Sequence, residues 1–153
     1  MRCFACKSEA LTTSTTADEF RFGDAVYSVV VPCLRCEACG ELTVAGADSE
    51  RAELAVAYAL SAHGSVTGAA FRHMRKVVGI SRGDMAGMLG VVPETVSRWE
   101  HDERAVDRAA WLLMATIVDE HRLGRSETLA RLRGLPGKPV TGVVALTMAP
   151  AAA

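Results

Sequence analysis

Residues 79–100 read GISRGDMAGMLGVVPETVSRWE, and this stretch decides the fold of the second half of the chain. Ser81 has a side chain that can cap the start of a helix. Gly90 suits a sharp turn after the helix, and Pro93 is favoured in the first turn of the next one. The pattern predicts two short helices joined by a sharp turn, at residues 82–89 and 93–101.

The apolar and polar residues of these two helices fall on opposite faces. Ala86 is small where the helices must cross closely, and Val96 and Trp99 form the inward face of the second helix. Four polar residues of that helix are left to face outward, where a recognition helix needs groups for base edges and phosphates. They are Glu94, Thr95, Ser97 and Arg98.

We expect Arg98 to contact a base, because a guanidinium can bind guanine through two hydrogen bonds. Glu94 has two open interpretations: it accepts a hydrogen bond from cytosine, or it stabilises the positive N-terminus of its helix. Thr95 and Ser97 are expected to contact phosphate or water. The segment therefore predicts a helix-turn-helix that binds the major groove of double-stranded DNA. The alternative is a helical bundle without DNA binding.

Three more predicted helices complete an all-α, five-helix domain over residues 69–135. The first ends at Gly79, and Asp107 and Ser126 are predicted to cap the other two. Beyond it, residues 136–153 form a tail without convincing periodicity. The three helices are expected at about 70–78, 108–120 and 127–134.

Cysteines dominate the first half of the chain. Cys3 and Cys6 form one C-x-x-C pair, and Cys36 and Cys39 form another about thirty residues later. This spacing is typical of a tetrahedral, structural zinc site with one ion per chain. Cys33 leaves an alternative open, in which Cys33 and Cys36 form the second pair. We favour Cys36 and Cys39, because Gly40 after them suits the tight turn that such a pair requires.

The cysteine pairs flank a predicted β-ribbon, and the fold class is therefore α+β. Residues 25–31 favour a strand, residues 20–22 can pair with it, and Gly23 and Asp24 can form the hairpin turn. The stretch 11–17 is a polar run for which we predict no element. A linking helix follows at residues 48–62, so that the zinc ribbon and this helix form a domain over residues 1–64.

Charge differs between the two halves. The net charge is −1, but residues 1–69 carry five Lys and Arg against nine Asp and Glu, and residues 70–153 carry twelve against nine. This distribution places nucleic-acid binding in the second half. No signal peptide is evident, and no apolar run approaches the roughly 18 residues that span a bilayer. We expect a cytoplasmic protein, where clustered cysteines indicate a metal before disulfides.

The segment from Phe71 to about Leu113 resembles the Xre/Cro-type helix-turn-helix family. The resemblance implies that Arg75 and Glu100 form a buried pair linking two helices, and that Glu94 and Arg98 read bases. It also implies that Arg82 contacts a DNA phosphate. Val92 departs from the family pattern, which has Ser or Thr as the cap, and Gly83 and Gly87 weaken their helix by up to ~1 kcal/mol each.

The whole order of parts resembles the MqsA/YgiT-type antitoxin family over about residues 1–120. The chain opens with Met-Arg-Cys-Phe-Ala-Cys, continues with Cys-Glu-Ala-Cys-Gly-Glu, and is followed by a helix and an Xre-type domain. The resemblance implies a structural zinc, a homodimer formed through the C-terminal domain, a palindromic operator and a toxin bound by the zinc domain. Cys33 and the tail are departures from the family.

Three functions remain open from the sequence. The first is an antitoxin that represses its own operon, and the second is a stand-alone, zinc-containing transcription regulator without a toxin. The third is a thiol redox enzyme or sensor that uses Cys33 and Cys36. We predict a repressor rather than an enzyme, with the antitoxin role preferred.

Overall fold

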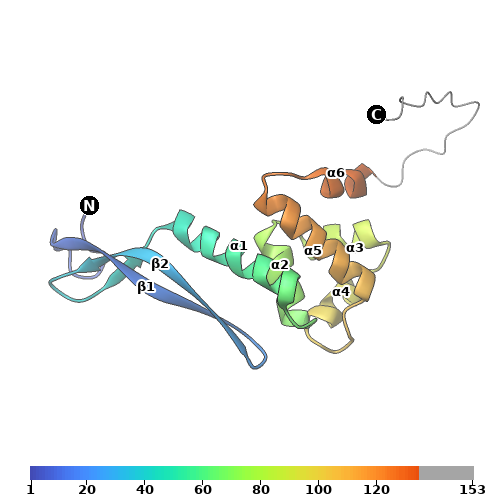
Figure 1. Ribbon diagram of the computed structural model, residues 1–153, viewed down its shortest axis with the longest axis horizontal. Coiled ribbons are helices and arrows are strands. Elements are labelled where there is room, and N and C mark those ends of the chain that lie inside the picture. The colour runs from blue at the N-terminus through green and yellow to red at the C-terminus, as the bar shows by residue number, and fades with distance from the viewer. Residues whose placement is uncertain (135–153) are drawn as a thin grey trace, which may run out of the picture.

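The computed structural model describes residues 1–134, and the predicted tail lies outside the described residues. A long β-ribbon occupies one end of the molecule and a group of helices the other, with α1 lying between them (Figure 1). The elements are β1 (Leu11–Phe22), β2 (Ala25–Cys36), β3 (Leu42–Val44), α1 (Gly46–His63), α2 (Gly68–Val77), α3 (Arg82–Leu89), α4 (Pro93–Glu100), α5 (Arg108–Arg122) and α6 (Glu127–Gly134). The predicted α+β class is confirmed.

The ribbon is an antiparallel sheet in the order β1-β2-β3. Phe22 lies opposite Ala25 at the hairpin turn, and Leu11 lies opposite Cys36 at the other end. Gly23 takes a positive φ of 59° in the turn, which its missing side chain allows. The polar run 11–17, for which no element was predicted, forms the first half of β1. Pairing with β2 orders it, although its own side chains carry little hydrophobic pattern.

The linking helix α1 packs on both halves of the molecule. Val56, Ala57 and Leu60 are buried in one continuous core with residues of α2 and α5, while α1 also contacts β2. Because α1 has neighbours on more than one side, its own apolar residues are spread around the helix rather than confined to one face. The helix that the sequence grouped with the ribbon therefore shares its core with the C-terminal helices.

The ends of the two central helices follow the sequence signals. The Ser81 hydroxyl accepts a hydrogen bond from the backbone N–H of Asp84 at 3.0 Å, and Gly90 ends α3 with a positive φ of 65°. Val92 stands at the N-cap of α4, followed by Pro93 in the first turn. The core around them contains Phe71, Met74, Met85, Ala86, Val96, Trp99 and Met114. Among residues 1–134, no helix has both the length and the apolar character needed to cross a membrane.

Candidate metal centre and nucleic-acid interface

Four cysteines come together at the end of the ribbon. The Sγ atoms of Cys3, Cys6, Cys36 and Cys39 all lie within 4.8 Å of one another. The Sγ atom of Cys3 lies 3.6 Å from that of Cys39, and Cys6 lies 3.5 Å from Cys36. Four sulfurs placed tetrahedrally at ~2.3 Å from one ion would be roughly 3.8 Å apart. The cluster therefore fits a single tetrahedrally coordinated metal ion.

The two cysteine pairs sit on matching turns. The backbone N–H of Lys7 donates to the carbonyl of Cys3 at 3.0 Å, and that of Gly40 donates to the carbonyl of Cys36 at 2.8 Å. The residue after each pair has a positive φ, 64° at Lys7 and 77° at Gly40. The sequence indicated the second turn through Gly40. The first turn uses a lysine in the conformation that glycine normally supplies, so its sequence carried no such signal.

The thiols of Cys3 and Cys39 differ in how readily they ionise. A backbone N–H of Cys6 stabilises the thiolate of Cys3 and lowers its pKa to about 7. At Cys39, the Glu41 backbone lowers the pKa, but the thiol of Cys6 and burial act against it, and the pKa rises to about 12. Four neighbouring thiolates repel one another. A divalent cation would offset this repulsion between thiolates, and it would bind the four groups in their deprotonated form.

Cys33 lies apart from this cluster. It is a buried residue of β2, opposite Ser14 on β1 and Val44 on β3. The structure thus brings together the four cysteines that the sequence favoured. Cys33 occupies the position of a small apolar core residue in the sheet.

The outward residues of α4 occupy different surroundings. Glu94 and Arg98 are exposed, whereas Thr95 and Ser97 are half-buried. Ser97 Oγ accepts a hydrogen bond from Arg82 Nη1 at 3.1 Å, which joins the start of α3 to the exposed face of α4. Thr95 lines a cavity of about 430 Å³ together with residues at the start of α5. Glu94, Ser97, Arg98 and Arg82 therefore form the polar surface.

A buried ion pair holds α2 and α4 together beneath this surface. Arg75 Nε donates to Glu100 Oε1 at 2.6 Å, and their side chains are 7% and 2% exposed. Arg75 Nη1 also donates to the carbonyl of Ile80 at 2.6 Å. The pair is the one that the family resemblance implied. Removing one partner would leave a buried charge, so the contact fixes how the two helices meet.

A cationic cavity of about 140 Å³ adjoins the pair. Its lining combines residues from α2, from the start of α3 and from the end of α4. Sequence reasoning missed three of its cationic or titratable residues, Arg72, Lys76 and His101. The spacing of Arg72 and Lys76, one helical turn apart, could have indicated them as neighbours. The full lining is Arg72, Arg75, Lys76, Arg82, Glu100 and His101.

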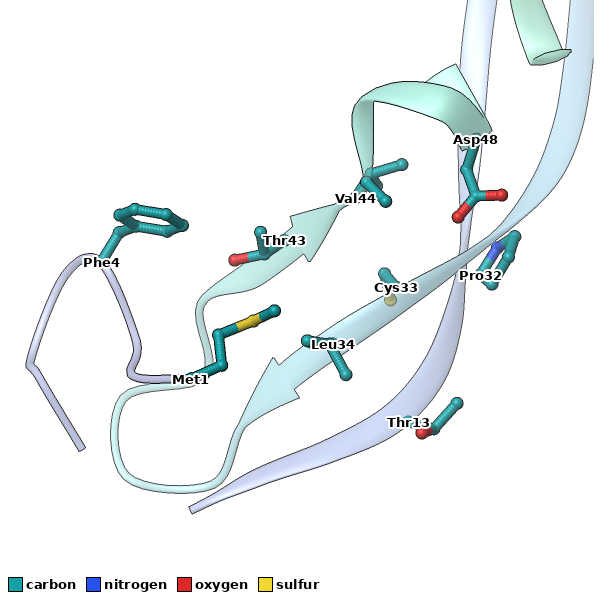
Figure 2. A pocket seen from close by; sticks show the side chains of 10 residues that line it. Met1, Phe4, Thr13, Pro32, Cys33, Leu34, Thr43, Val44 and Asp48 are labelled. Carbon is teal, nitrogen blue, oxygen red and sulfur yellow. The ribbon is translucent and has the colours of Figure 1, made fainter. Parts of the chain in front are cut away.

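A third hollow, largely apolar, is lined by Phe4, which lies between Cys3 and Cys6 in the turn beside the metal centre; Figure 2 shows its lining. It has a volume of about 410 Å³ between the N-terminal turn, β2, β3 and the start of α1. Met1 and Phe4 on its rim are 87% and 74% exposed. Asp48 is the one charged residue among those lining it, beside Met1, Phe4, Thr13, Pro32, Cys33, Leu34, Thr43, Val44 and Ala45.

No family model, curated protein or solved structure matches the chain at a significant level.

Proposed function

We propose that the protein is a sequence-specific, DNA-binding transcriptional repressor that uses α3 and α4. The observation that carries this proposal is the exposed face of α4, with Arg98 and Glu94, beside the cationic cavity at the start of α3. A helix with an exposed polar face next to a concentration of positive charge suits a major groove flanked by phosphates. The role is one of binding, without catalysis.

In this proposal each exposed residue has a separate task. Arg98 reads guanine through two hydrogen bonds, and Glu94 accepts a hydrogen bond from cytosine or stabilises the N-terminus of α4. Arg82 binds a phosphate while Ser97 holds its guanidinium in place. Thr95 faces the cavity beside α5 and contributes phosphate or water contacts only from the edge of the interface.

The metal in the cysteine cluster is proposed to be zinc. Four thiolate ligands favour zinc or iron, and zinc requires no electron-transfer partner. Because Cys3, Cys6, Cys36 and Cys39 would fill all four positions, no site would remain for water or substrate. The ion would therefore supply folding energy rather than chemistry. Metal analysis of the purified protein should find one zinc per chain, and iron in its place would contradict the assignment.

Binding-site selection tests the DNA-binding proposal directly. The metal-loaded, full-length protein would be incubated with a random pool of duplex DNA, and the bound fraction sequenced over several rounds. We expect a palindromic sequence with half-sites about 34 Å apart, bound by a homodimer. In the cell, the proposed repressor would act in the cytoplasm. If no sequence is enriched over the starting pool, the proposal is wrong. A monomer on a single half-site would contradict only the dimer.

An antitoxin role is the more specific form of the proposal. It is supported by the resemblance to the MqsA/YgiT-type family and by the exposed apolar rim of Met1 and Phe4 beside the metal centre, since large apolar groups in water favour a protein partner. A stand-alone regulator is the alternative. A neighbouring gene for a small basic toxin would favour the antitoxin, and operator binding without such a gene would favour the regulator.

Co-expression with that neighbouring protein separates the two. The toxin should co-purify with the wild-type chain and lose affinity for Phe4→Ser. The matched control is Leu112→Ser, which removes an exposed apolar side chain from α5. An equal loss of toxin affinity in Phe4→Ser and Leu112→Ser would show that the hollow beside the metal centre is not the toxin site.

A further inference from the structure

The turn end of the β1–β2 hairpin, called the tip below, docks on α2 through one histidine. His73 is half-buried, and its ring lies edge-to-face against Phe20 and Phe22, with ring centres 5.7 Å and 5.3 Å away. Tyr27, from the other strand, packs edge-to-face on Phe22 at 5.8 Å. The contact therefore joins both strands of the hairpin to the helical part of the molecule.

A hydrogen bond fixes the orientation of the same ring. His73 Nε2 lies 3.1 Å from the backbone carbonyl of Glu53 on α1. A carbonyl can only accept, so Nε2 must carry the hydrogen of the neutral ring. An added proton must then bind Nδ1, and the charged ring would remain among phenylalanine rings and away from much of its water.

We propose that the hairpin tip and α2 form a pH-sensitive contact, in which protonation of His73 releases the tip from the helices. The ring is the one group titrating near neutral pH that we find within this aromatic cluster of the described chain. Docking half-buries the neutral imidazole against the phenylalanine rings. When the tip is released from α2, the imidazole is exposed to water, where its charged form is stable.

The surrounding charges do not reverse this preference. Burial is the main influence and lowers the pKa of His73 below its ordinary value of 6.5. The carbonyl and carboxylate of Glu53 raise the pKa, and Lys76 lowers it. The charged residues nearest the contact along the packed elements are Glu53 on α1, Arg72 and Lys76 on α2, Asp18, Glu19 and Arg21 on β1, and Asp24 in the hairpin turn, with the titratable Tyr27 on β2. Glu19 and Arg21 pair with each other, and Arg75 of α2 is paired with Glu100.

The pH range follows from that direction. Above pH 6.5 the ring is neutral in both the docked and the released tip, and docking has its full strength. As the pH falls below 6.5, the released form gains a proton more readily than the docked form. Each unit by which docking lowers the pKa weakens the docking equilibrium by about tenfold at low pH. The tip should therefore be held at neutral pH and loosened in mild acid.

Amide hydrogen exchange of the metal-loaded, full-length protein tests the contact. Protection of residues 20–27, corrected for the intrinsic effect of pH, should fall severalfold between pH 7.5 and 5.5. In His73→Phe, which keeps an aromatic ring without titration, protection should be equal at both values. His63→Phe is the matched control, since His63 is an exposed histidine at the end of α1, and it should behave like wild type.

An NMR titration of His73 provides a second measurement that does not depend on the folding of His73→Phe. Its pKa should lie below 6.5 in the wild-type protein and return toward 6.5 in Phe22→Ser, which weakens the docking. A wild-type pKa at or above 6.5, or an unchanged pKa in Phe22→Ser, would overturn the proposal. Protection that does not depend on pH in the wild type would do the same. The inference stands independently of DNA binding.

Discussion

Arg98 is the residue on which the recognition of a base depends in the proposed function. It lies in the last turn of α4 with its side chain exposed. Arg98→Ala should lower the affinity for the selected operator by about 1–3 kcal/mol and leave the affinity for random DNA much less affected, because a bidentate contact with guanine discriminates between bases. Fluorescence anisotropy with both DNAs measures the difference. Arg131→Ala, which removes the same charge from α6, is the control, and an equal loss there would assign the effect to charge alone.

The cationic cavity leads to a different prediction. Arg72 and Lys76 are exposed residues of α2 that line it. Replacing both by Gln should weaken the binding of operator and random DNA by the same factor. The slope of log K against log salt should become shallower by about 0.9 for each phosphate that the protein no longer neutralises. An altered sequence preference with an unchanged slope would show that these residues do not bind phosphates.

These residues also show where sequence reasoning at the residue scale stops. The outward polar set of α4 follows from helical periodicity, because one helix face is a local property. The cationic cavity combines residues from three helices, and its members become neighbours only through the fold. A turn was expected at both cysteine pairs, but the positive φ of Lys7 was not indicated, because a lysine gives no sign of that conformation in the sequence.

At the scale of the elements, the junction between α2 and α4 is closer than the sequence suggested. Residues 65–68 lie between the two predicted domains, but Gly68 is the first residue of α2. A Cβ atom at Gly68 would lie 1.9 Å from the backbone carbonyl oxygen of Trp99. The Gly68 N–H also donates to Asp102 Oδ1 at 2.7 Å. The glycine is thus required by close backbone packing rather than by flexibility.

Gly68→Ala should therefore destabilise the protein by at least about 2 kcal/mol, because backbone atoms on both sides would have to move. Gly87→Ala is the matched control. Its Cβ would meet no atom within 4 Å, and alanine in the helix interior should stabilise α3 by up to ~1 kcal/mol. Urea unfolding of the metal-loaded proteins measures both changes. Equal stability of Gly68→Ala and wild type would contradict the packing argument.

The elements differ in how much of them the sequence could reveal. Helix ends at Ser81, Gly90 and Asp107 were predictable, because capping is decided by neighbouring residues. The first half of β1 was not, since a polar Ser/Thr run becomes a strand only through pairing with β2. The packing of α1 on α5 likewise depends on residues far apart in the sequence, and predicting where each helix begins and ends does not reveal it.

At the scale of the whole molecule, the ribbon is held at both ends by different means. The cysteine cluster closes its N-terminal end, away from α2–α6, while the opposite end contacts α2 and α1 packs against β2 (Figure 1). The proposed metal and the helical core would therefore be separate supports. A structural zinc site contributes about 10–16 kcal/mol of binding energy in small domains, but in the proposed function that energy would act on one end of the ribbon.

Removing the metal should consequently loosen one end of the molecule and spare the other. In Cys3→Ser, or after chelation, amide protection should disappear from residues 1–14 and 33–44, because the turns and β3 depend on the cluster. The helices should keep their circular dichroism, with a loss of stability of no more than about 1 kcal/mol, or roughly 4 °C in Tm. Cys33→Ala, outside the cluster, should keep the same metal content as wild type. Simultaneous loss of ribbon and helices would instead show that the metal supports the whole chain as one cooperative unit.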